Sequence, residues 1–273
     1  MNKVFGILLV GFVLAIGSSV NAGNWNKSQK HGVQKGYRFK DTDWSHTFYA
    51  NAGFPSNSEE RWNARWLAEG KTKFLRFRLF NGQIGTSSSD NKNRSGAAYW
   101  ERAEVKAGPA KNQIFYFNKK KAYEIDFRVR FVEGFLDDRE TFFQIHNYMK
   151  GCKQSSTPPI MLKFSSGIFR QDFATGWHNH SRAYPKNLGH ITVKNLYKEW
   201  QTFRLIYGPS SQDGFAATKL FLNDVLIADE EKVWQAKCGK PHIKFGIYRP
   251  GDKNIPIKTS IVDFDYIKIR EIK

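Results

Sequence analysis

Short segments in which apolar and polar residues alternate recur along most of the chain. They are rich in Phe, Tyr, Ile and Val, and most are bounded by Gly, Pro, Asn, Asp or Ser. Because successive side chains of a strand point to opposite faces, each segment predicts a strand with one buried face. Their regular spacing predicts an all-β fold, a jelly-roll sandwich of two antiparallel sheets. The predicted strands are residues 73–80, 113–118, 123–132, 141–146, 160–164, 202–207, 219–223, 242–249 and 260–269.

One helix is predicted, over residues 58–68. Asn57 precedes it as an N-cap, Trp62 and Trp66 lie four residues apart on one helical face, and Gly70 follows as a stop signal. Three polar segments, residues 85–96, 152–159 and 175–188, are expected to be exposed loops. Long loops on one side of a β scaffold commonly border a binding cleft.

The first 22 residues have the pattern of a secretory signal peptide. Lys3 gives a positive start, residues 4–16 form an apolar run, and V-N-A at 20–22 resembles the small residues before a cleavage point. A membrane anchor is the competing interpretation, but a span needs about 20 apolar residues, and G-S-S at 17–19 ends this run early. We therefore expect a signal peptide at 1–22, one mature domain at 23–273 and a secreted or periplasmic protein without a membrane anchor after cleavage.

The charge of the chain favours an anionic partner. Lys and Arg number 43 and Asp and Glu 25, which gives a formal net charge of +18. Anionic polysaccharide, nucleic acid and anionic membrane all fit this charge, and charge alone does not separate them. Nucleic acid is disfavoured, since the usual basic and aromatic binding motifs are missing from the sequence. Aromatic residues make up 15% of the chain, which excludes a disordered protein.

Cys152 and Cys238 are the two cysteines of the chain. An even number of cysteines in an oxidising compartment predicts a disulfide rather than two free thiols. Neither cysteine has the neighbours of a zinc site, and no C-x-x-C or H-E-x-x-H pattern occurs. The sequence therefore predicts a disulfide and no catalytic metal.

Three strand segments carry the candidate chemistry. In residues 100–105, 143–146 and 243–248, the apolar side chains fall on one face and the polar side chains on the other. Side by side in one sheet, the three segments would present a single polar surface. The two cysteines support neighbouring strands, because antiparallel pairing would bring both to the same end. The polar side chains are those of Arg102, Glu104, Gln144, His146, Lys244 and Tyr248.

Each of these residues also has an ordinary interpretation when it is taken alone. A single strand histidine is usually a hydrogen-bonded surface residue, and Arg102 with Glu104 could be a common same-face ion pair. Lys244 could be a solvated charge and Tyr248 a partly buried ring with a polar tip. The three segments together are much harder to explain in this way.

The three segments resemble the strand motifs of a known group of enzymes. R-x-E at 102–104, Q-I-H at 144–146 and K-F-G-I-Y-R at 244–249 resemble, in this order, the polysaccharide lyases of the heparin lyase I and glucuronan lyase group. In variant form, the same motifs are similar to those of the β-jelly-roll alginate lyases. E-W-Q-T-F-R at 199–204, D-G at 213–214 and L-N-D at 222–224 are similar to further stretches of the group. The sequence departs from the group at Val105, after R-x-E, and at Ile145, within Q-I-H.

The resemblance covers roughly residues 70–270 and implies both a fold and an activity. The fold would be a concanavalin-like jelly roll with a concave substrate groove. The activity would be that of a carbon–oxygen lyase that cleaves a uronic-acid-containing polysaccharide by β-elimination and leaves unsaturated uronate ends. No cofactor would be required. Gly246, between Lys244 and Tyr248, would leave space for a sugar ring.

Such a reaction assigns a role to each residue of the polar surface. Arg102, Gln144 and, in its protonated form, His146 are suited to bind the uronate carboxylate and so to stabilise the negative charge that develops beside it. His146 suits the role of base, and Tyr248, next to Lys244, suits that of acid. Tyr248 alone could fill both roles, and the sequence leaves this choice open.

A second set of residues is expected to bind the substrate around the reacting sugar. Glu104 would also orient Arg102, whereas Trp177 and two histidines would lie on a loop that covers the cleft or would belong to an ordinary polar loop. The substrate-binding set is Glu104, Arg249, Tyr148, His178 and His180.

Two other functions compete with the lyase. A retaining glycoside hydrolase would need a strand with properly spaced carboxylates, and Glu124 and Asp126 begin such a pattern, but Arg128 and Arg130 follow on the same face. A non-catalytic lectin of the same fold is the stronger alternative, because a fold does not imply an activity.

The remaining predictions concern metal and assembly. Asp263 and Asp265 share one strand face and could help to bind a structural calcium ion, although such a pair more often contacts Lys or Arg. We expect a monomer whose partner is an anionic polysaccharide.

Overall fold

A computed structural model describes the chain over residues 37–38, 47–50, 64–80, 90, 99–108, 115–133, 140–185, 191–192, 196–251 and 259–272. The predicted signal peptide and most of the predicted loop at 85–96 lie outside the described residues. No helix within the described ranges is long and apolar enough to span a membrane.

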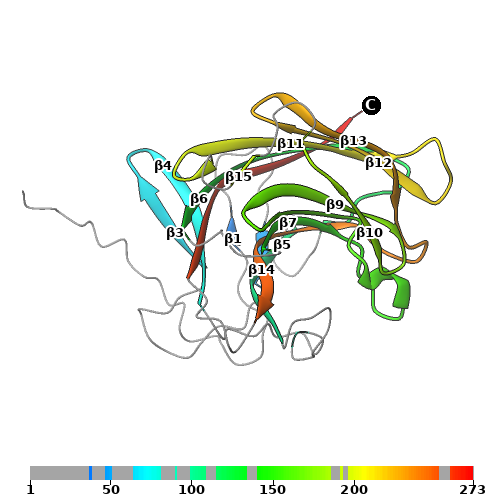
Figure 1. The fold of residues 1–273 in the computed structure, drawn as a ribbon, viewed down its shortest axis with the longest axis horizontal. Helices are drawn as coiled ribbons and strands as arrows, with labels where there is room; N and C mark the ends of the chain where they lie inside the picture. Colours follow the sequence, from blue (N-terminus) through cyan, green and yellow to red (C-terminus); the bar gives the residue numbers. More distant parts are fainter. Residues whose placement is uncertain are drawn as a thin grey trace, which may run out of the picture.

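The strands form two antiparallel sheets that pack face to face as two layers (Figure 1). This confirms the predicted jelly-roll sandwich. The larger sheet has eight strands in the order β1 (Tyr37–Arg38), β2 (Thr47–Ala50), β5 (Tyr99–Gly108), β14 (His242–Gly251), β7 (Glu140–His146), β8 (Ile160–Ser165), β9 (Ile168–Gly176) and β10 (Asn179–Ala183). The smaller sheet has seven strands in the order β13 (Val225–Trp234), β12 (Phe215–Leu222), β11 (Trp200–Pro209), β6 (Ala122–Glu133), β15 (Ser260–Ile272), β4 (Thr72–Leu79) and β3 (Ala64–Glu69).

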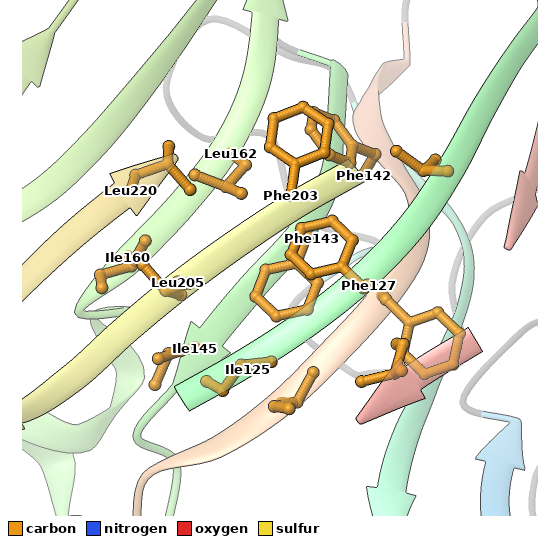
Figure 2. Packing of buried hydrophobic residues seen from close by; sticks show 14 of the residues in the cluster. Ile125, Phe127, Phe142, Phe143, Ile145, Ile160, Leu162, Phe203, Leu205 and Leu220 are labelled. Carbon is orange, nitrogen blue, oxygen red and sulfur yellow. The ribbon is translucent and has the colours of Figure 1, made fainter. Parts of the chain in front are cut away.

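The core lies between the sheets and is built mainly from phenylalanine and branched aliphatic residues. Phe127 of β6 stacks on Phe143 of β7 with ring centroids 4.3 Å apart, and on Phe203 of β11 with centroids 5.2 Å apart. Figure 2 shows these rings packed in one cluster with aliphatic side chains of both sheets, among them Ile145 of the larger sheet and Leu205 of the smaller one. The predicted alternation therefore places the apolar side chains of these strands in one core, with an irregularity in β7, where the consecutive residues Phe142 and Phe143 are both buried.

Most predicted strands coincide with strands of the structure, whereas some elements were predicted wrongly or missed. Residues 115–118 are not a strand, although Phe117 is buried and its N–H bonds to the Pro241 carbonyl at 2.8 Å. The predicted loop at 175–188 contains β10, and the loop at 152–159 contains a short 3-10 helix, Lys153–Ser156. The predicted strands also do not include β1, β2, β9 and β13.

The helix predicted over 58–68 is wrong for the part that the structure describes. Residues 64–68 belong to β3, which pairs with β4 across a two-residue turn at Gly70 and Lys71. Gly70 has φ 57°, the left-handed region that favours glycine and that tight hairpin turns use. The glycine that was interpreted as a helix stop is therefore the start of a hairpin turn.

The disulfide joins Cys152 and Cys238, whose Cα atoms are 5.8 Å apart. Cys152 follows β7 and Cys238 precedes β14, and these two strands pair antiparallel. The bond therefore ties the chain together beside the ends of the two strands that carry the Q-I-H and K-F-G-I-Y-R motifs.

Candidate active site

The three motif-bearing strands lie side by side, as predicted. Strand β14 is in the middle, with β5 on one side and β7 on the other. The register places Tyr248 opposite Arg102, and Lys244 opposite Gln144. The apolar residues of the same strands are fully buried in the core. The polar side chains therefore share the outer face of the eight-stranded sheet, the face that points away from the seven-stranded sheet.

Glu104 is the centre of the contacts on this face. The Nε2 atom of Gln144 donates a hydrogen bond of 2.5 Å to Glu104 Oε1, and the Nζ atom of Lys244 donates one of 3.1 Å to Oε2. The guanidinium of Arg102 lies 3.5 Å from the same Oε2 atom. Glu104 is buried and both of its oxygens are engaged. It therefore positions three other side chains, and its contact with the substrate stays a prediction.

Arg102 also links the face to Tyr248. Its guanidinium donates a hydrogen bond of 2.9 Å to Asp90, and its Cζ atom lies 4.5 Å from the centre of the Tyr248 ring. Trp100, two residues before Arg102 on β5, stacks on the same ring with centroids 4.9 Å apart. The phenol of Tyr248 is therefore held by a cation and an indole while the side chain remains partly exposed.

His146 lies at the end of β7, where it is partly exposed and faces His242 of β14 at 5.7 Å between ring centroids. Burial lowers the pKa of His146 well below its ordinary value, and the nearby charges of Lys244 and Arg102 lower it further. The imidazole is therefore neutral at pH 7. The backbone N–H of Tyr148 donates to Nδ1 at 3.0 Å, so the neutral ring carries its proton on Nε2.

The ammonium group of Lys244 has a lowered pKa. Burial lowers its pKa from 10.5 to about 8, the charge of Arg102 lowers it as well, and Glu104 opposes both effects. Lys106, opposite Lys244 on β5, has a lowered pKa for similar reasons, burial first and Arg102 second. The outer face therefore holds a group of closely spaced cations around one buried carboxylate.

Arg249 does not belong to this face, and its predicted role in a neighbouring subsite is wrong. It is 1% exposed, and its guanidinium contacts Glu101 at 2.6 Å and Glu140 at 2.9 Å. A third contact reaches the Ser260 hydroxyl of the other sheet at 2.6 Å. Because Arg249 follows Tyr248 directly, strand alternation turns it toward the interior.

The other predicted substrate-binding residues lie at the margin of the outer face. Tyr148 is 51% exposed and its ring centroid is 6.3 Å from that of His146. His178 and Trp177 form the exposed turn between β9 and β10, and His180 lies on β10 with its Nε2 atom 3.2 Å from the Pro158 carbonyl. Strands β8 and β9 therefore separate the two histidines from the cluster around Glu104.

The structure explains Gly246 by the path of the backbone rather than by the predicted space for a sugar ring. Its φ is 125°, and a Cβ atom there would lie 2.2 Å from the Ala103 carbonyl oxygen of β5. The glycine therefore permits the close approach of β14 to β5 beside Tyr248. The pairing of β14 with β7 is irregular at the same place.

The structure does not support calcium at the predicted carboxylates. Asp263 contacts Arg76 at 2.6 Å and Arg130 at 2.8 Å, and Asp265 contacts Arg128 at 3.0 Å. These arginines engage both oxygens of Asp263 and one oxygen of Asp265, so a calcium ion would have to compete with them. Among the described residues, no group of three or more His, Cys, Asp or Glu side chains is placed to hold a metal ion.

Sequence reasoning missed four residues of the site. Trp100 and Lys106 continue the alternation of Arg102 and Glu104 along β5, and His242 continues that of Lys244 along β14, so the signal was present. Asp90 carried no signal, because it approaches Arg102 from a segment far from any predicted strand.

Comparisons with known proteins identify a family and a fold. A model of the polysaccharide lyase family matches residues 42–263. The family 7 alginate lyase A1-II′ has a TM-score of 0.53 and 11% identity over 82% of this chain and 95% of its own. An alginate lyase from Corynebacterium sp. has a TM-score of 0.51 and 12% identity over 80% of this chain and 84% of its own.

The alginate lyase of Pseudomonas aeruginosa has a TM-score of 0.53 and 12% identity over 79% of this chain and 87% of its own. No curated protein matches the sequence. The structural likenesses support the jelly-roll fold, and the family match sets aside the non-catalytic lectin. The chain belongs to the polysaccharide lyase family and is a carbon–oxygen lyase that acts on polysaccharides.

Proposed function

We propose that this lyase cleaves an anionic, uronic-acid-containing polysaccharide by β-elimination and leaves unsaturated uronate ends. One observation carries the proposal. Tyr248 and His146, both partly exposed, border a buried group of cations that Glu104 holds in place. This arrangement provides a proton-transferring phenol next to a region of positive charge, which is what the elimination of a uronate needs.

The cations address the difficult part of the reaction. Removing the hydrogen beside the uronate carboxylate places a second negative charge next to an existing one. Gln144 donates one amide hydrogen to Glu104 and retains a second for the carboxylate of the substrate. Arg102 and Lys244 supply positive charge that is already fixed before the reaction, so little reorganisation is needed as the charge develops.

We assign the proton transfers to Tyr248 rather than to His146. In the neutral imidazole the Nδ1 lone pair accepts the Tyr148 N–H, so the remaining nitrogen, Nε2, carries a hydrogen and donates. His146 then stabilises the substrate carboxylate as a hydrogen-bond donor. Tyr248, in its phenolate form and with Arg102 beside it, takes the proton from the sugar, and the phenol so formed donates that proton to the leaving glycosidic oxygen.

The substrate class follows from charge and likeness together. The resemblance of R-x-E, Q-I-H and K-F-G-I-Y-R favours glucuronan and heparin-like chains, and the structural neighbours are named alginate lyases. All three polymers carry uronic acids. We further propose that the protein acts as a secreted or periplasmic monomer and requires no cofactor for the elimination.

Incubation of the purified protein with a panel of uronate polymers tests the proposal. The ultraviolet absorbance of the unsaturated product should rise with wild type, and Tyr248→Phe should abolish the rise while the protein still binds polymer. New reducing ends without the ultraviolet signal would show hydrolysis and overturn the proposal. A product formed only from neutral polysaccharides would overturn the assignment to uronates.

A further inference from the structure

A second group of cations lies on the same outer face, on strands β8, β9 and β10. Lys163 and Arg170 are 7% and 5% exposed, and both contact Asp172, Lys163 Nζ at 2.5 Å and Arg170 Nε at 2.8 Å. Arg182 is exposed on β10 and is the register partner of Asp172. Asp172 is the only carboxylate in the sequences of these three strands, so the two buried cations share one anion and Arg182 is paired opposite it.

Stabilisation of the fold does not by itself explain why these cations lie together. Lys163 and Arg170 are register partners on adjacent strands, where like charges repel. Both side chains are nearly buried, and removing a charge from water costs free energy that a single shared carboxylate does not offset twice. Burial lowers the pKa of Lys163, and the charges of Arg170 and Arg182 lower it further against the opposing effect of Asp172. The group therefore has an excess of positive charge that an additional anion would offset.

The register connects this group to the active site. Tyr248 of β14 is paired with Thr141 of β7, Thr141 with Lys163 of β8, and Lys163 with Arg170 of β9. Paired residues of adjacent strands lie in a line across the sheet, on the same face. Lys163 is two strand spacings from Tyr248, about 10 Å, and Arg170 is three, about 14 Å. The first distance is comparable with the length of a disaccharide.

We propose that Lys163, Arg170 and Arg182 form a second anion subsite, which binds the carboxylate of a uronate about one disaccharide away from the bond that is cleaved. The inference rests on the proposed function, because it assumes that the substrate is a chain of uronates lying across the strands. Asp172 holds the two buried cations in place, and the exposed Arg182 closes the subsite at the edge of the sheet. The enzyme would therefore bind long chains more tightly than short ones.

Binding to the catalytically inactive Tyr248→Phe protein tests the subsite without relying on turnover. The probes are the hexasaccharides and disaccharides of mannuronate and glucuronate. Adding Arg182→Gln removes one charge-assisted contact and should therefore weaken hexasaccharide binding about tenfold. The affinity for the disaccharide should not change. The matched control is Lys232→Gln, which removes an exposed cation of β13 in the other sheet and should change neither.

The result separates this proposal from the proposed function. An unchanged hexasaccharide affinity in the Arg182→Gln protein, an equal loss for both lengths, or no hexasaccharide binding at all would each overturn the subsite. Failure of the wild-type protein to form unsaturated product from any uronate polymer would overturn the proposed function instead. A methyl-esterified hexasaccharide, which lacks the carboxylates, should bind equally to the proteins with and without Arg182→Gln.

Discussion

Lys244 on β14 and Glu104 on β5 form an ion pair of 3.1 Å between two buried side chains. The carboxylate also receives the amide of Gln144 and lies 3.5 Å from Arg102. A buried charge without its partner is costly, so these groups depend on one another. Glu104 thus links the strand that carries the arginine to the strands that carry the phenol and the imidazole.

Replacing Glu104 tests this dependence. Glu104→Gln keeps the volume but removes the negative charge, which leaves Lys244 and Arg102 without their shared counterion. We expect the free energy of unfolding, measured by urea denaturation, to fall by about 3–5 kcal/mol. Glu231→Gln, an exposed acid on β13, is the matched control and should change it by less than about 0.5 kcal/mol. Equal effects of the two substitutions would contradict the central position of Glu104.

The lowered pKa of Lys244 predicts a loss of activity in alkaline solution. Because burial brings the pKa to about 8, the ammonium form is present below that pH and is lost as the pH rises through it. The rate of product formation should therefore fall above about pH 8. Lys244→Arg keeps its charge throughout this range and should move the fall to higher pH. An unchanged alkaline limb in this variant would show that another group titrates.

If His146 acts as a hydrogen-bond donor, its variants should differ in kcat in a defined order. A glutamine amide can place an N–H near the position of the imidazole Nε2–H, but it cannot act as a base at neutral pH. His146→Gln should therefore retain at least about tenfold more kcat than His146→Ala, the value of one hydrogen bond to a charged group. If both variants are equally inactive, His146 acts as the base and the assignment to Tyr248 is wrong.

The sequence was most informative where alternation decided the face of a residue. Arg102, Gln144 and Tyr248 were placed correctly because a period of two, with apolar partners between them, leaves one orientation for each strand. Strand alternation also determines the orientation of Arg249. Arg249 follows Tyr248, so it had to face the interior.

Other features depended on contacts that no local pattern reports. Arg170, Gln171 and Asp172 are consecutive polar residues and break the alternation of β9, so this strand was missed. Asp90 reaches Arg102 only through the tertiary fold. The spacing of Trp62 and Trp66 suits a helix, but the pairing of β3 with β4 overrides that local preference.

The buried His242 predicts a sensitivity of the fold to acid. Burial lowers its pKa from 6.5 to about 3. Between these values the unfolded chain binds a proton that the folded chain does not, so stability falls as the pH drops from 6.5 toward 3. At pH 4 this difference in proton binding lowers the free energy of unfolding by about 3 kcal/mol.

The variant His242→Gln does not titrate and isolates this effect. Between pH 7 and pH 4, the wild-type protein should lose about 3 kcal/mol more unfolding free energy than the variant loses. A difference that is independent of pH would contradict the prediction.

Arg249 predicts a structural rather than a substrate-binding defect. Arg249→Met leaves Glu101 and Glu140 buried without their shared cation, and the free energy of unfolding should fall by about 3–5 kcal/mol. The control is Arg270→Gln, which removes an arginine that is largely exposed and pairs with Glu124, and which should cost at most about 1 kcal/mol. A stable Arg249→Met protein with weakened substrate binding would restore the original prediction of a subsite.

Mass spectrometry of the products formed in oxygen-18-labelled water tests the central claim most directly. If Tyr248 drives a β-elimination, wild type should release uronate oligosaccharides with an unsaturated end and without label from water at the cleaved bond, and Tyr248→Phe should release none. Label at the new reducing end, without an unsaturated sugar, would show that water attacks the chain and would contradict the mechanism.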